Sequence, residues 1–190
     1  MSEPSLEERK RFWLWNYANT SFESALEACG IFERESARAS SKALTAILAG
    51  IVVTYAKPFM RCHGVGELPD EFVPSGLRRF HDPVMNFRHK LFAHLDSINF
   101  HDDQDSVGNL NNISIRKNKN GEWSVHVGTI LPTPLYHELH MRELCERMLE
   151  KAGYHLDRFN ARYVAKRTLK PGKYLLNIDA KDLRAFVPIK

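Results

Sequence analysis

Cysteine is scarce in this sequence, and its spacing argues against two classes of small protein. The chain of 190 residues has three cysteines, Cys29, Cys62 and Cys145, and no two of them form a CxxC pair. An odd number of distant cysteines favours neither a disulfide framework nor a zinc ribbon. Reduced thiols are the simplest interpretation, and we expect a cytoplasmic protein.

Long hydrophobic runs and a large excess of one charge are also missing. The longest apolar run, residues 43–56, contains two threonines and a glycine and is too short to cross a bilayer, so it predicts a buried helix. The first residues are polar and acidic, unlike a signal peptide. We therefore expect no membrane contact. The formal net charge is +4, which permits a polyanionic partner without requiring one.

Apolar residues recur at helical spacing in four segments. The predicted helices span residues 5–28, 33–60, 77–96 and about 135–166. Ser5 and Glu8 form a capping-box pattern at the first helix, and Gly30 is its natural stop. Asp82-Pro83 is a start signal for the main part of the third helix. Gly153 divides the fourth.

Alternating apolar residues on either side of a turn predict a β-hairpin at about residues 112–128. The sequence therefore predicts a mainly α fold, an up-and-down helical bundle with an inserted β-hairpin. We assign residues 1–166 to one helical domain and residues 167–190 to a C-terminal extension, with a short strand over residues 173–179.

The stretch from residue 87 to residue 96, FRHKLFAHLD, places an arginine, two histidines, a lysine and an aspartate among otherwise apolar residues. Arg88 and His94 flank an apolar ridge of the third helix, about 9 Å apart along its axis. Random placement of the chain's arginines and histidines also produces such a spacing, so the spacing alone carries no information. A ridge of this kind must pack against something, which would leave both polar groups partly desolvated.

This stretch resembles the signature helix of the HEPN superfamily, the higher eukaryotes and prokaryotes nucleotide-binding domains. That pattern is an arginine, a polar residue, a few further residues and a histidine, and Arg88, His89 and His94 match it. The segment from Tyr55 to Phe59 is similar to bacterial members related to abortive-infection proteins. The resemblance spans roughly residues 5–165 in helix order, and the hairpin departs from a plain bundle.

The resemblance implies a metal-independent endoribonuclease with Arg88 and His94 as catalytic residues. Histidine can move protons near neutral pH, and arginine can hold a phosphate and stabilise transition-state charge. The products would be a 2′,3′-cyclic phosphate and a 5′-hydroxyl. Candidate substrate-binding residues are His89, Lys57, Arg61 and Tyr55. We expect no metal and no cofactor.

The implied partners are RNA or a nucleotide, a second copy of the chain, and an antitoxin in a defence or toxin–antitoxin setting. The dimer would form through the second and third helices and place the site in a shared cleft. The alternative is a non-catalytic nucleotide- or protein-binding module, or a purely structural role for Arg88 and His94. The aromatic cluster of Phe12, Trp13, Trp15 and Tyr17 has two interpretations, a base-stacking platform or core plus interface.

Overall fold

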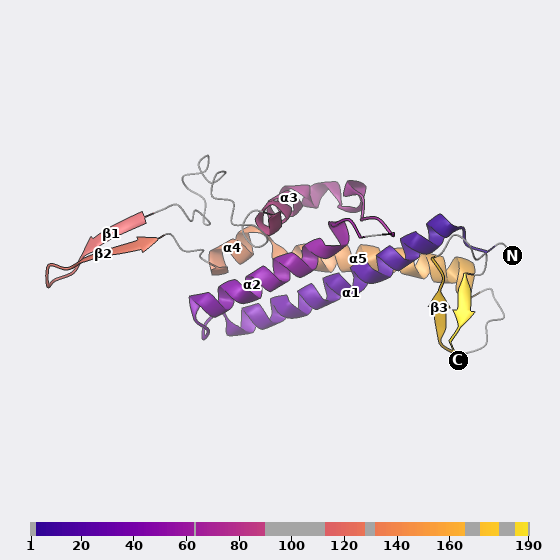
Figure 1. Cartoon of the computed structure of the whole chain (residues 1–190), viewed down its shortest axis with the longest axis horizontal. Coiled ribbons are helices and arrows are strands. Elements are labelled where there is room, and N and C mark those ends of the chain that lie inside the picture. Colours follow the sequence, from indigo (N-terminus) through magenta and orange to yellow (C-terminus); the bar gives the residue numbers. More distant parts are fainter. Residues whose placement is uncertain are drawn as a thin grey trace.

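The protein is described from a computed structural model, which covers residues 3–62, 64–89, 113–127, 132–165, 172–178 and 185–189. It is mainly helical, as predicted, with a small antiparallel β-hairpin. The elements in these residues are α1 (Leu6–Glu35), α2 (Ser41–Ala56), α3 (Arg78–Phe87), β1 (Ile113–Lys117), β2 (Trp123–Val127), α4 (Pro132–Glu138), α5 (Met141–Phe159), β3 (Tyr174–Leu176) and β4 (Phe186–Pro188). Helix α1 packs against both α2 and α5, which run back along it (Figure 1).

The first helix begins where the sequence predicts and ends later. The Ser5 hydroxyl accepts from the Glu8 backbone N–H at 3.2 Å, and the Glu8 carboxylate accepts from the Ser5 N–H at 2.9 Å, which completes the capping box. The prediction that Gly30 stops the helix is wrong, because α1 continues to Glu35. Phe32, 1% exposed, packs in the core beyond that glycine, and such packing outweighs the weak helix propensity of one glycine.

The second helix is shorter than predicted. Residues 33–35 belong to α1 and residues 36–39 form a turn, so α2 begins at its N-cap Ser40, whose hydroxyl accepts from the Ala43 N–H. After Ala56 the chain tightens into a 3₁₀ turn over Lys57–Phe59, which contains Pro58. The helical chain therefore ends within one residue of the predicted end at residue 60, and Pro58 lies at this end as predicted.

The third and fourth helical segments are divided differently from the prediction. Helix α3 begins at Arg78 and contains Pro83 in its interior, so Asp82-Pro83 is not its start. The break in the fourth segment lies at His140, which has a left-handed φ of 48° between α4 and α5, and not at Gly153. Helix α5 then continues as a π turn over Asn160–Val164.

Two antiparallel strand pairs complete the described chain. The pairing of β1 with β2 confirms the predicted hairpin, which stands beyond one end of the helices in Figure 1. Strand β3 confirms the short strand near residue 174, and its partner β4 was not predicted. This second pair lies on the helices: Arg9 donates from Nη1 to the Asn177 carbonyl at 2.8 Å, and the Phe159 and Phe186 rings are 6.5 Å apart.

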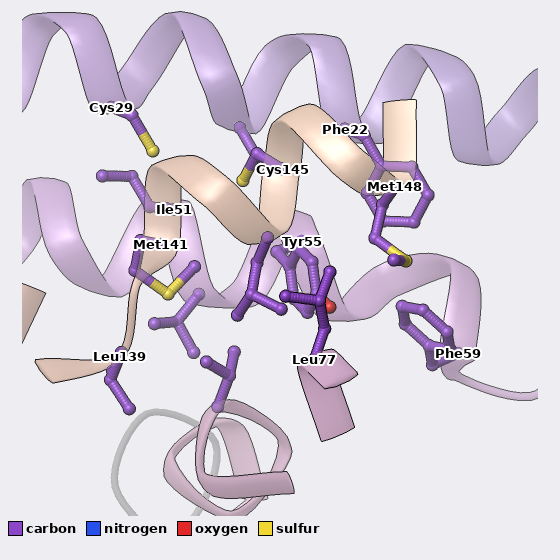
Figure 2. Close-up of a cluster of buried hydrophobic side chains, with 14 of the residues drawn as sticks. Phe22, Cys29, Ile51, Tyr55, Phe59, Leu77, Leu139, Met141, Cys145 and Met148 are labelled. Atoms are coloured by element: carbon purple, nitrogen blue, oxygen red, sulfur yellow. The ribbon is translucent and has the colours of Figure 1, made fainter. Parts of the chain in front are cut away.

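The core lies between α1, α2 and α5, and residues from α3 and the loops close it (Figure 2). Phe22 of α1 is fully buried beside Tyr55 and Phe59, with ring centroids 5.6 and 6.0 Å away. Met148 of α5 is also fully buried. This packing fixes the C-terminal end of α2 relative to α1.

One segment of the described chain, Ser41–Phe59, has the length and mean hydropathy that a membrane-spanning helix needs. Leu48, Ile51 and Val52 of this segment are fully buried inside the protein. The core helix of a globular protein has the same composition. Its packing against α1 and α4 therefore favours the buried helix that the sequence predicts.

Candidate phosphate-binding site

A hollow of about 220 Å³ lies where the C-terminal end of α2, the loop after it and the C-terminal end of α3 meet α1. Its lining residues are Tyr17, Val53, Lys57, Met60, Arg61, Cys62 and Arg88. Pockets for whole small molecules occupy roughly 300–1,000 Å³. The hollow is therefore suited to one chemical group of a larger ligand.

A tight loop after α2 shapes one side of this hollow. The backbones of Cys62 and Gly66 exchange two hydrogen bonds, of 2.8 and 2.9 Å. Gly64 and Gly66 have φ of 83° and 102°, a region that glycine adopts without strain. The Leu68 N–H donates to the Pro58 carbonyl at 2.8 Å and ties the returning chain to the end of α2. The loop thereby holds Arg61 and Cys62 beside Lys57.

The described side chains that line the hollow give it a positive charge. Lys57, Arg61 and Arg88 line it, and none of the other described lining residues is a carboxylate. Within the described residues, none of these three cations forms an ion pair. Neighbouring like charges without counter-charges attract anions and raise their local concentration. A phosphate group, with several acceptor oxygens, matches this arrangement.

Arg88 is half-buried and contacts its neighbour His89, which is exposed. The distance from Arg88 Nη1 to His89 Nδ1 is 3.1 Å. Because a guanidinium can only donate, His89 Nδ1 accepts this bond, and the proton of the neutral imidazole lies on Nε2. His89 is not among the residues that line the hollow, and its contact with the site is the hydrogen bond that it accepts from Arg88.

Tyr55, predicted as a substrate contact, does not line the hollow and lies in the core instead. Its side chain is fully buried, and its hydroxyl lies 2.9 Å from Nδ1 of His81. Burial raises the pKa of the Tyr55 hydroxyl and lowers the pKa of His81. The tyrosine therefore keeps its proton and donates to a neutral imidazole, which is a bond inside the core.

The predicted catalytic partner of Arg88 is His94, which lies outside the described residues. The structure brings together Arg88, Lys57 and Arg61 from the predicted set, and it places His89 beside Arg88. Among the described residues, no three His, Cys, Asp or Glu side chains gather closely enough to hold a metal ion.

Four residues that line the hollow were not predicted as site residues, namely Tyr17, Val53, Met60 and Cys62. Cys62 was considered only in the cysteine count, and no sequence signal marks it. Tyr17 was part of an aromatic cluster with two interpretations. Its i, i+4 spacing from Trp13 was the available signal, because residues four apart share one face of a helix.

Comparison of the chain with protein-family models, with curated proteins and with solved structures gave no match. The chemistry of the site is therefore argued from its own residues.

Proposed function

We propose that the protein is a metal-independent endoribonuclease that holds an RNA phosphate in the hollow formed by Lys57, Arg61 and Arg88. The observation that carries this proposal is the convergence of three cations from two segments far apart in the sequence, with no ion-pair partner and no carboxylate in the hollow among the described residues. The resemblance of the Arg88–His94 segment to the HEPN signature adds the reaction type.

The chemistry assigned to these residues is transesterification of RNA by its own 2′-hydroxyl. The 2′-oxygen attacks the phosphorus, the bond to the 5′-oxygen breaks, and a 2′,3′-cyclic phosphate and a 5′-hydroxyl form. In this proposal His94 moves the proton and Arg88 stabilises the charge that develops on the phosphate oxygens. Lys57 and Arg61 orient the backbone by contacts to phosphate.

The proposal includes a homodimer that forms through α2 and α3 and joins two sites in one cleft. Ala46 and Gly50 of α2 are exposed, and a Cβ built on Gly50 would meet no atom within 4 Å. Small residues of this kind allow a second helix to approach closely. We further propose an up-and-down bundle of α1, α2, α3 and α5, a cytoplasmic location, and a defence or toxin–antitoxin role with an antitoxin as partner.

A second candidate function is a non-catalytic module that binds a nucleotide or a protein. The same three cations favour it, because they suffice to hold a phosphate without any proton-transfer group. The two functions differ in one consequence: only the nuclease changes the covalent structure of RNA.

The test incubates the wild-type protein, Arg88→Ala and His94→Ala with single-stranded RNA in excess EDTA and follows fragments on a denaturing gel. A matched control is Arg79→Ala, which removes an equal charge from the same helix. Arg79 is exposed and lies over the Phe80 ring at 4.6 Å, outside the hollow. Circular dichroism checks that all four proteins are folded.

The nuclease proposal expects cleavage by the wild type and by Arg79→Ala, and loss of at least a hundredfold in rate for the other two variants, in the range of general acid–base and charge-stabilising contributions. Equal rates for all four proteins would contradict it. RNA that binds through Arg88 but stays intact would establish the second candidate instead.

A further inference from the structure

Two aromatic side chains on α1 form a stacked pair that does not belong to the hydrophobic core. The ring centroids of Trp13 and Tyr17 are 5.4 Å apart with an interplanar angle of 17°. Both side chains are half-buried. Trp15, between them in the sequence, instead packs against the core and stacks on His155. Packing of the core therefore explains the position of Trp15, whereas the Trp13–Tyr17 pair is not part of that core.

This pair adjoins the cationic hollow. Tyr17 lines the hollow together with Lys57, Arg61 and Arg88, and Trp13 stacks on Tyr17 from one helical turn before it. The Tyr17 hydroxyl has no hydrogen-bond partner among the described residues. A half-buried aromatic pair thus adjoins a site where, among the described residues, three cations lie without a carboxylate.

We propose that Trp13 and Tyr17 stack an unpaired base of the RNA whose phosphate lies in the hollow, so that the ligand is single-stranded. This inference rests on the proposed binding of an RNA phosphate by Lys57, Arg61 and Arg88. Proteins that bind single strands combine a positive groove for the backbone with aromatic side chains for the bases. Both elements are present here within one surface.

The geometry selects single strands over duplexes. In a duplex both faces of an internal base are covered by its neighbours, so an aromatic side chain can stack only after a base has been taken out of the helix. In a single strand that step costs little. The Trp13–Tyr17 pair therefore adds affinity for unpaired RNA and adds none for the sugar–phosphate backbone alone.

The experiment measures binding by fluorescence anisotropy with two oligonucleotides of equal length and phosphate number. One is a 2′-O-methyl RNA, which carries bases and has no free 2′-hydroxyl to cleave. The other has abasic sugars throughout. The proteins are the wild type, Trp13→Ala, Trp13→Phe, Arg88→Ala and the matched control Trp15→Phe. Trp13 is half-buried and is not part of the core cluster, so its alanine variant is expected to fold.

The expected result is selective. Trp13→Ala lowers the affinity for the base-containing strand by about tenfold and leaves the abasic strand unchanged, because stacking acts on bases only. Trp13→Phe retains most of the affinity, and Trp15→Phe leaves both affinities unchanged. Binding of the base-containing strand also quenches tryptophan fluorescence in the wild type and in Trp15→Phe, and much less in Trp13→Phe.

Two results would overturn the stacking role. Equal losses for both strands in Trp13→Ala would mean that the pair supports the fold of the hollow. No loss for either strand would mean that the pair serves another surface, such as a protein contact. If Arg88→Ala weakens both strands while Trp13→Ala changes neither, the phosphate site stands and the stacking role fails alone. If the wild type binds neither strand, both proposals fail.

Discussion

Replacing Arg88 by alanine removes one of three cations from the hollow, and the expected effect on the salt dependence of RNA binding follows from that number. For single strands the slope of log K against log salt is about −0.7 per neutralised phosphate, so three contacts give about −2.1 and two give about −1.4. Between 50 and 200 mM KCl the affinity of the wild type should fall about 18-fold, and that of Arg88→Ala about 7-fold.

The assay is a titration of labelled 2′-O-methyl RNA at four salt concentrations, followed by anisotropy. Arg79→Ala lowers the net charge equally but leaves the hollow intact, so its slope should match that of the wild type. A slope that is the same in all three proteins would refute the reasoning, because Arg88 would then make no phosphate contact. An equal reduction of the slope in Arg79→Ala would show that overall charge and not the hollow attracts the RNA.

Three further changes test the fold around the site. Tyr55→Phe should lower the free energy of unfolding by about 1–3 kcal/mol in urea titrations, because it leaves His81 Nδ1 without its buried partner, and should leave RNA affinity unchanged. Glu33→Gln should cost about 0.5–1 kcal/mol at pH 7, since the half-exposed Glu33 carboxylate accepts from Arg142 at 2.5 and 2.7 Å. The hydrogen bond from Arg142, followed by that from Tyr136, lowers the pKa of Glu33 in the folded protein. The stabilisation is therefore complete above the usual carboxyl pKa and is lost as the pH falls through the lowered pKa of the folded state. Below that pH the wild type and Glu33→Gln should have the same free energy of unfolding. Phe22→Ala should cost about 3–5 kcal/mol in the same urea assay, because the ring is fully buried, and a cost below about 1 kcal/mol would contradict the core assignment.

Local sequence signals predicted those parts of the fold that local interactions determine. Ser5 and Glu8 cap the first helix through their own side chains, and the turn between β1 and β2 is formed by its own residues. The helix ends and helix breaks that were predicted wrongly depend on contacts with residues distant in the sequence. Helix α1 continues past Gly30 because Phe32, beyond it, is buried in the core, and Pro83 is tolerated inside α3, where His81 and Val84 are buried.

The candidate site shows the same division. Lys57 and Arg61 follow an apolar helix four residues apart, which was enough to identify them as candidate phosphate contacts. Their meeting with Arg88 depends on how α3 returns to α2, and no local pattern encodes that return. The burial of Tyr55 could not be predicted from its place near the helix end, because its partner in the core, His81, lies 26 residues away.

Whether RNA is cleaved through its own 2′-hydroxyl is tested most directly by the chemistry of the fragment ends. RNA is incubated with the wild-type protein in excess EDTA, and the fragments are analysed by mass spectrometry alongside a strand that carries one 2′-deoxy nucleotide at the preferred cleavage position. We predict 2′,3′-cyclic phosphate and 5′-hydroxyl ends, and no cleavage at the 2′-deoxy position. Fragments with 3′-hydroxyl and 5′-phosphate ends, cleavage at the 2′-deoxy position, or intact RNA would contradict the proposed reaction.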